Sequence, residues 1–198
     1  MRHQLTADRG ARAARWGAAA LGLALLGAIL GCAEAARPTA VVVQATDATL
    51  AAPGELLHRA VSVGAVLGGE ATTMLSKSKM SNADFREGLT TSLKLSDLLA
   101  DDPSASRYIL DTTIEGVAQP NLQVNFTVTS TIYYRLRGRD GRIHYDQRIT
   151  HAATAKIGDS IVREERIRLA TEASVRENLE RFLKQVTERS RAEPYDFI

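Results

Sequence analysis

The chain has 198 residues, of which 24% are charged, with a formal net charge of +2 and a single cysteine. One cysteine excludes an intramolecular disulfide framework and any metal site built from several thiolates. The length suits one domain of ordinary size, and the near balance of charge provides no concentrated basic face, so no nucleic-acid partner is expected.

The start of the chain has the organisation of a bacterial secretory signal. Four arginines give it a positive end, and residues 17–30 form a 14-residue apolar run. This run is shorter than the roughly 20 residues of a membrane-spanning helix. A small residue, Gly31, then precedes Cys32, which completes the order of a cleavable signal. The segment Ile-Leu-Gly-Cys at 29–32 resembles the lipobox of bacterial lipoproteins, which implies diacylation of Cys32, cleavage before it and acylation of the new amino terminus.

Processing before Cys32 changes the properties of the chain. Residues 1–31 contain four Arg, one Asp and the single tryptophan, Trp16. The mature chain therefore has 21 basic and 22 acidic residues, a formal charge of −1, and no tryptophan. Ala33 follows the cysteine, and in familiar sorting systems a residue other than Asp there favours the outer over the inner membrane. The predicted location is a lipid-anchored position in the cell envelope, facing the periplasm.

The segment that follows the anchor is predicted to be a tether. Residues 32–57 are rich in Ala, Thr and Pro, and Pro38 and the Pro53-Gly54 pair interrupt any regular structure. Residues 40–43 are a short β-prone run, and whether they form a strand stays open. The first predicted strand covers residues 60–66.

A helix is predicted at residues 82–99. Ser81 is a suitable N-cap, and Asp84, three residues later, can complete an arrangement like a capping box. Apolar residues recur along one side of this segment at four-residue spacing; they are Phe85, Leu89 and Leu93. Gly88 costs about 1 kcal/mol of helix propensity relative to Ala, and its small size predicts close packing on the sheet.

Three strands are predicted next, at residues 107–119, 122–137 and 142–155. The middle one alternates clearly between apolar side chains and threonines or other polar side chains. This pattern is typical of a sheet with one buried and one polar face. The pair Asp140-Gly141 is favoured in tight hairpins and predicts the connection to the last strand.

The last predicted element is a long helix at residues 160–189 with one broad apolar side, followed by a C-terminal tail at 190–198. The element order β-α-β-β-β-α predicts an α+β fold. Two helices would cover one face of a four-stranded, mainly antiparallel sheet, which gives a two-layer sandwich around one core. The single domain is expected to span residues 58–189.

The sequence predicts no catalytic residues, no metal site and no cofactor. His144 and His151 have opposite parity on one predicted strand, so they cannot both face a single site. Both are expected to be exposed or to lie at a rim. No pair of histidines stands at helical spacing with a glutamate, and neither a nucleophile elbow nor a phosphate-binding loop is present. The protein is therefore expected not to be an enzyme.

One loop is distinctive because it combines apolar and basic side chains, and these are Met74, Leu75, Lys77, Lys79 and Met80. Met-rich surfaces adapt to varied ligands, and lysines attract anionic head groups, so the loop could form a lip that contacts a lipid or a partner. The alternative is an ordinary loop whose apolar residues pack against the helix, and we favour this alternative.

Three blocks of sequence resemble a known group of proteins. They are SNADFR at 81–86 with Leu89, Ser92 and Leu93, then Gln119-Pro120 followed by TVTSTIYY at 127–134, and RIRLA at 166–170 leading to ASVRENL at 173–179. Together they resemble small bacterial envelope lipoproteins, and the expected topology is similar to YajG-type lipoproteins and the auxiliary lipoproteins of ABC-type lipid transport systems. The likeness covers most of residues 58–187. Its blocks are structural, so no site residue carries over.

The resemblance implies a module without enzymatic activity that assists lipid transport or envelope maintenance. Its partners would be the membrane, through the acyl anchor, and an envelope transporter or another envelope protein. Two other functions stay open at this point. One is a carrier of a lipid or another apolar ligand, held between helices and sheet or under the loop at 74–80. The other is an envelope enzyme such as an acyltransferase.

Overall fold

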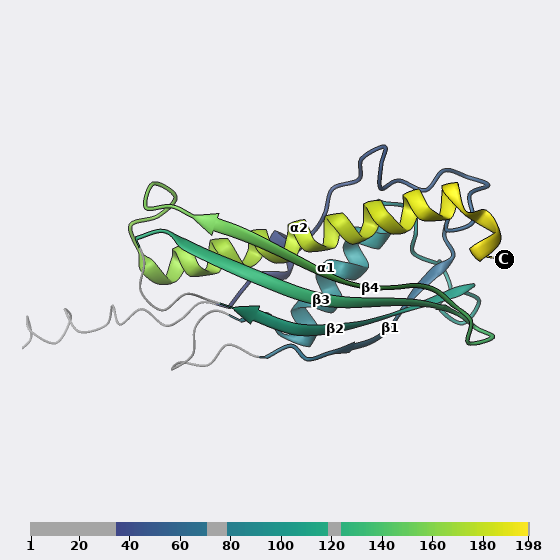
Figure 1. Cartoon of the computed structure of the whole chain (residues 1–198), viewed down its shortest axis with the longest axis horizontal. Coiled ribbons are helices and arrows are strands. Elements are labelled where there is room, and N and C mark those ends of the chain that lie inside the picture. Colours follow the sequence, from purple (N-terminus) through teal and green to yellow (C-terminus); the bar gives the residue numbers. More distant parts are fainter. Residues whose placement is uncertain (1–34, 71–78, 119–123, 198) are drawn as a thin grey trace, which may run out of the picture. The chain divides into compact units, whose positions relative to one another are not determined.

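The computed structural model describes residues 35–70, 79–118 and 124–197. These residues belong to one compact unit (Figure 1). Cys32 and the predicted signal lie outside the described residues. Within the described ranges, no helix is both long and apolar enough to cross a bilayer.

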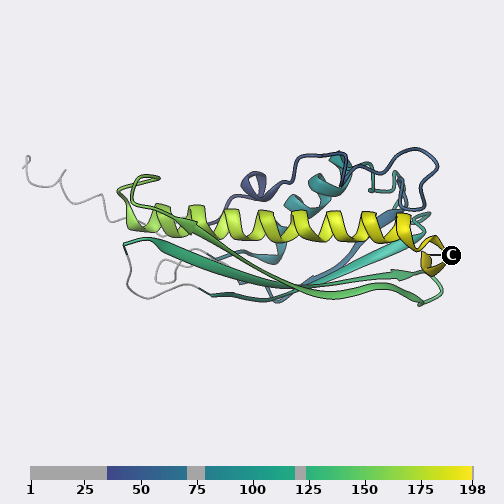
Figure 2. The ribbon, with the colours of Figure 1, turned by 45° about the horizontal axis from the view of Figure 1, so that its top comes forward.

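A four-stranded sheet with the strand order β1-β2-β3-β4 forms one layer of the domain. The strands are β1 (Val61–Leu67), β2 (Tyr108–Ala118), β3 (Phe126–Gly138) and β4 (Ile143–Ala155). β1 is parallel to β2, and the other neighbours are antiparallel. The helices α1 (Asn82–Leu95) and α2 (Arg163–Ala192) form the second layer and cover one face of the sheet (Figure 2). The predicted α+β class and element order are confirmed.

The alternating sequence of β3 produces the two different faces of the sheet. Every second side chain from Phe126 onward is buried, and Ile132 and Tyr134 are fully buried against the helices. The Tyr134 ring stacks on Phe182 of α2 with 4.3 Å between centroids. The other face carries threonines and ion pairs, for example Arg137 with Asp111 at 2.8 Å. The predicted division into an apolar and a polar face is correct.

α1 begins as the sequence predicts, because the Ser81 hydroxyl accepts a hydrogen bond from the Asp84 amide at 3.1 Å. It ends earlier than predicted, at Leu95 instead of residue 99. Asp97 adopts a positive φ of 52°, a conformation that Asp tolerates better than most residues. This turn sends the chain back to the sheet, where Leu99 pairs with Val61 at the start of β1.

A buried polar network fixes α2 on the sheet. Asn178 donates hydrogen bonds to the backbone oxygens of Ser130, at 3.2 Å, and Ile149, at 2.8 Å, and it accepts one from the Tyr134 hydroxyl at 3.0 Å. The Ser130 amide donates to the Ser174 hydroxyl at 2.9 Å. Burial raises the pKa of Tyr134 well above its usual value, so this phenol stays protonated and acts as the donor. The network sets the register of α2 along β3 and β4.

Residues 35–57 are not a tether, and this corrects the prediction from composition. Five apolar side chains spread along the segment are at most 3% exposed and belong to the main core; they are Ala36, Val41, Val43, Ala51 and Leu57. Pro38–Val41 form a 3-10 helix, η1, so the run at 40–43 is not a strand. The small side chains that make this segment resemble a linker allow it to fit closely against the helices. The folded domain therefore begins near residue 36 and not near residue 58.

Polar contacts hold this segment at both ends of its path along α2. The Arg37 amide donates to the Glu172 carboxylate at 2.9 Å, and Glu172 is only 3% exposed. Farther along, Arg191 forms an ion pair with Glu55 at 2.9 Å. The hydrogen bond from the Arg191 guanidinium lowers the pKa of the Glu55 carboxyl below its usual value. The segment is thus bound to α2 through its charged groups as well as through its apolar ones.

Gly88 explains how the N-terminal segment approaches α1 so closely. A Cβ atom at this position would lie 2.3 Å from Cγ2 of Val41 and 3.2 Å from the backbone oxygen of Pro38. The glycine therefore makes room for η1. The sequence-based prediction that it packs on the sheet is wrong. Ser92, one turn later on α1, accepts a hydrogen bond from the Val43 amide at 2.9 Å.

Candidate functional site

Of the five residues that the sequence predicts in a contact loop, the structure describes two, Lys79 and Met80. Met74, Leu75 and Lys77 lie outside the described residues, as does Cys32. Lys79 forms an ion pair with Glu70. Met80 is 1% exposed and belongs to the main core, so this side chain is not a surface contact. For Met80, the interpretation as a residue packed inward is correct, and the other predicted contacts stay predictions.

A small cavity lies beside Met80. Its volume is about 60 Å3, and its lining consists of Gly68, Glu70, Lys79, Met80, Ile114 and Val117. Pockets that bind small molecules usually have about 300–1,000 Å3. The space that the described residues enclose here fits ordered water and is too small for an acyl chain.

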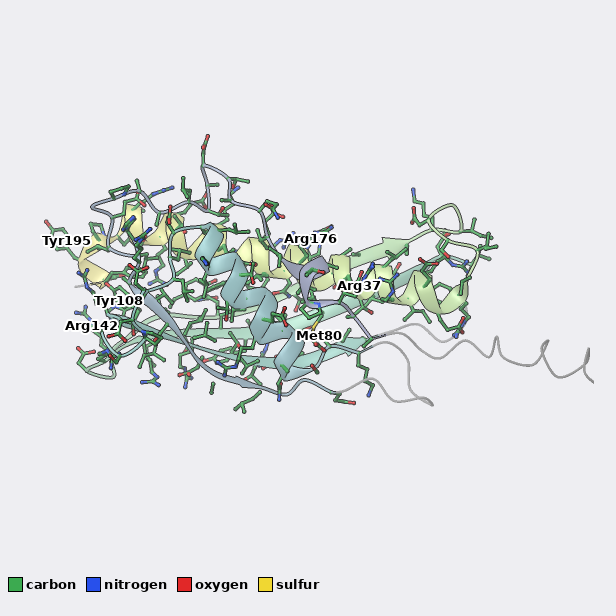
Figure 3. The ribbon with its side chains drawn as sticks, turned by 180° about the vertical axis from the view of Figure 1, so that it is seen from behind. Arg37, Met80, Tyr108, Arg142, Arg176 and Tyr195 are labelled. Carbon is green, nitrogen blue, oxygen red and sulfur yellow. The ribbon has the colours of Figure 1, made fainter. Side chains whose placement is uncertain are left out.

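A larger pocket lies at the other end of β2, and we call it the C-terminal pocket. It has a volume of about 550 Å3 and is lined by Ala105, Ser106, Arg107, Tyr108, Gly138, Arg139, Asp140, His144 and Phe197. The lining comes from the start of β2, the β3–β4 hairpin and the end of the chain. Figure 3 shows Tyr108, Arg142 and Tyr195 at this end of the domain, away from Met80 and Arg37.

His144 reaches this pocket because β4 is irregular. Leu136 pairs with Tyr145 whereas Arg137 pairs with Ile143, so His144 is an extra residue without a partner on β3. A bulge of this kind changes which side chains face inward. His144 is 6% exposed and Tyr145 is 3% exposed, while Ile143 is 50% exposed. The prediction that His144 is exposed or at a rim is wrong for this reason.

Aromatic rings form the floor of the C-terminal pocket. The His144 ring stacks on Phe197 at 5.6 Å and lies edge-on to Tyr108 at 5.1 Å. The Tyr108 hydroxyl donates to the backbone oxygen of Phe197 at 2.6 Å, and Nδ1 of His144 lies 2.6 Å from the backbone oxygen of Asp196. Since a carbonyl only accepts, Nδ1 carries the proton. The tail is therefore docked by a short 3-10 helix, η2 (Pro194–Phe197).

Charged side chains surround this aromatic floor. Arg139 donates to the backbone oxygens of Ser106 at 2.5 Å and Pro103 at 2.6 Å, which fixes the loop before β2. Arg107 is exposed at the rim. Ser106 is 2% exposed, and its hydroxyl donates to Ser62 at 2.8 Å, so this group is already engaged in a structural contact. The rim of the aromatic floor thus carries both a guanidinium, from Arg107, and a carboxylate, from Asp140.

The second histidine lies far from the pocket. Nε2 of His151 is 2.5 Å from a carboxylate oxygen of Glu177 on α2, so His151 also faces the helical layer. The two histidines are seven residues apart on one strand, which corresponds to roughly 23 Å. The two histidines do not share a site, as predicted. The reason is the distance between them along β4, and not the opposite parity of their positions. In the described ranges, no group of three or more His, Cys, Asp or Glu side chains could hold a metal ion.

In the comparisons with known proteins, similarity was found only to solved structures. No model of a protein family matches the chain, and no curated protein matches it. A candidate lipoprotein from Caulobacter crescentus is 15% identical, with a TM-score of 0.48 over 70% of this chain and 94% of that protein. A protein of the DUF330 family from Xanthomonas campestris is 10% identical, with a TM-score of 0.48 over 78% and 99% of the two chains. A hypothetical protein from Chlamydia trachomatis is 13% identical, with a TM-score of 0.46 over 64% and 96%.

Proposed function

We propose that this protein is a lipid-anchored module without enzymatic activity on the periplasmic side of the cell envelope, and that it assists envelope maintenance or ABC-type lipid transport. The observation that carries the proposal is the lipobox at 29–32, directly followed by a folded domain. Acylation of Cys32 with several chains would hold the domain at a membrane, because each buried CH2 adds about 0.8 kcal/mol. Ala33 after the cysteine favours the outer membrane.

The start of the folded domain supports a role at the membrane surface. Ala36 is already 2% exposed, and three residues separate it from Cys32. Four residue steps of extended chain span at most about 14 Å. An anchored domain of this kind works close to the bilayer and cannot cross the periplasm on a long linker.

The C-terminal pocket supports a binding role. Its aromatic floor, formed by Tyr108, His144 and Phe197, is held in place by hydrogen bonds to the backbone of the tail. Aromatic and arginine side chains are enriched where proteins bind partners. We propose that this surface receives an envelope partner, such as a subunit of a transporter.

The anchor and the partner are tested separately. The Cys32→Ser variant should leave the membrane fraction, and density separation of the two membranes should find the unaltered protein in the outer one. A photo-crosslinking residue at Arg107, on the pocket rim, should capture an envelope protein, and the same residue at exposed Gln147 on β4 serves as the control. A Cys32→Ser protein that stays on membranes would contradict the anchor. Equal capture at both positions, or none, would contradict the pocket as the partner site.

A further inference from the structure

Four exposed apolar side chains gather at the end of the domain where α2 begins. They are Val124 at 68% exposure, Ile157 at 57%, Ile161 at 90% and Val162 at 49%, and we call them the apolar tip. Phe126 pairs with Ala155 at the last step of the β3–β4 ladder, so Val124 and Ile157 each lie two residues beyond the same end of the sheet. Ile161 and Val162 directly precede Arg163, the first residue of α2. In Figure 1 this loop joins β4 to α2 at the end opposite the C-terminus.

Hydrogen bonds hold the loop of the tip in a defined shape. Arg166 donates to the backbone oxygen of Ser160 at 2.6 Å, and the Ser160 hydroxyl accepts from the Val162 amide at 3.0 Å. Lys156 and Asp159 close a turn through the Asp159 amide, which donates to the Lys156 oxygen at 3.0 Å. These hydrogen bonds order the loop, while its two isoleucines are exposed to solvent. Single exposed apolar residues are common, but a group of them on an ordered surface marks an interaction site.

The position of the acyl anchor determines which end of the domain can contact the membrane. The Arg37 amide is bonded to Glu172, which lies nine residues after the start of α2, or about 14 Å along the helix. The end of α2 at Ala192 lies twenty residues farther, or about 30 Å away. Cys32 is within about 14 Å of Ala36 along the chain. The anchor can therefore reach the level of the apolar tip and cannot reach the level of the C-terminal pocket.

We propose that the apolar tip docks on the bilayer beside the acyl anchor, so that the domain stands with its C-terminal pocket directed away from the lipid. This inference rests on the proposed acylation of Cys32. Residues 156–166 contain three basic and three acidic side chains, so the tip is neutral overall and suits an apolar contact. Insertion would be shallow, on the order of 5–10 Å into the boundary between head groups and acyl chains. Neutral phosphatidylcholine should be sufficient.

The chain offers a clean way to measure this contact. Because its one cysteine is the acylated Cys32, an Ile161→Cys variant of the mature lipoprotein has one free thiol for an environment-sensitive fluorophore. Tyr195→Cys is the matched control, since Tyr195 is 83% exposed at the other end of α2. Both proteins are placed in phosphatidylcholine vesicles that contain nitroxide-labelled lipids, and vesicle flotation is measured on the same samples. We expect blue-shifted emission and several-fold stronger quenching by the lipids at 161 than at 195.

Each other result has a distinct meaning. Flotation of both proteins with no quenching at 161 would overturn docking of the tip and leave the anchor intact. Equal quenching at 161 and 195 would show a domain that lies flat, which also overturns the proposal. A label at 161 that is shielded but not quenched by lipid would identify a second copy of the chain as the occupant and overturn it as well. Failure of the unlabelled protein to float would instead reject acylation of Cys32.

Discussion

Replacing Gly88 by alanine tests whether the N-terminal segment belongs to the folded domain. In an exposed helix this change stabilises by about 1 kcal/mol, because glycine has a lower helix propensity than alanine. Here the added methyl group would lie 2.3 Å from Cγ2 of Val41, a side chain with no exposed surface. Overpacking of a full core costs about 1–3 kcal/mol. Since the Pro38 oxygen also stands 3.2 Å from the new atom, we expect a cost near the upper limit and a net loss of about 2 kcal/mol.

A double-mutant cycle with Val41→Ala identifies the contact. Alone, Val41→Ala should cost about 2 kcal/mol, because it removes two buried methyl groups. In the Gly88→Ala background the new methyl group occupies part of the vacated space, so we expect a coupling of about 1–2 kcal/mol. The assay is urea unfolding followed by far-ultraviolet circular dichroism, on the mature chain carrying Cys32→Ser. Gly116→Ala is the control, since a Cβ there meets nothing within 4 Å.

A stabilising effect of Gly88→Ala would refute this reasoning. It would mean that residues 38–41 do not pack on α1 and that the segment after the anchor is a tether, as its composition suggests. If Gly88→Ala destabilised the protein without coupling to Val41→Ala, the new methyl group would contact a residue other than Val41.

Three further predictions follow from buried groups. Asn178→Ala should lower the free energy of unfolding by about 3 kcal/mol, because its three hydrogen-bond partners lose their bonds, whereas exposed Asn125→Ala should change it by less than about 0.5 kcal/mol. Phe197→Ala should lower the free energy of unfolding by about 3 kcal/mol and loosen the tail, whereas Tyr195→Ala, at an exposed position of the same tail, should leave it almost unchanged. Chemical unfolding measures both variants, and equal effects would contradict the docked tail. Burial raises the pKa of Tyr145 to about 12 in the folded state, above its ordinary value of 10. The folded state therefore holds this proton more tightly, and its stabilising contribution, complete below pH 10, should be lost as the pH rises from 10 to 12; a free energy of unfolding that rises over this range would contradict the assignment.

The sequence predicts those parts of the fold whose signals are local. The alternation along β3 needs only the two-residue period of a strand. The Ser81 cap and the turn at Asp140-Gly141 depend on neighbouring residues, and Gly141 has the positive φ of 88° that such a turn requires. Each of these features is fixed by residues within a few positions of one another, so a pattern in the chain suffices to find it.

The composition of the N-terminal segment predicts a tether, and this prediction fails because the packing of the segment is not local. Alanine, threonine and proline give a weak hydrophobic signal, whether they lie in a linker or in a close contact. Val41 is buried because Gly88 leaves room for it, and Val43 is held by Ser92, 49 residues farther along the chain. A glycine within an otherwise good helix was the available signal, and the surface that it would meet was not evident from the sequence.

The C-terminal pocket escaped prediction for a similar reason. It requires a bulge at His144, and regular alternation along β4 predicts the opposite orientation for this side chain. It also requires the tail, whose Phe197 reaches the start of β2, 89 residues earlier in the chain, through the Tyr108 hydroxyl. A histidine and a phenylalanine near the ends of two elements carry no joint signal until the fold brings them together.

The mass of the intact protein extracted from membranes tests the central claim most directly. We predict the mass of residues 32–198 with a diacylglyceryl group on the sulfur of Cys32 and an acyl chain on its amino group, and no tryptophan absorbance. A mass equal to the unmodified 198-residue chain, with Trp16 retained, would contradict the lipid anchor and the orientation derived from it.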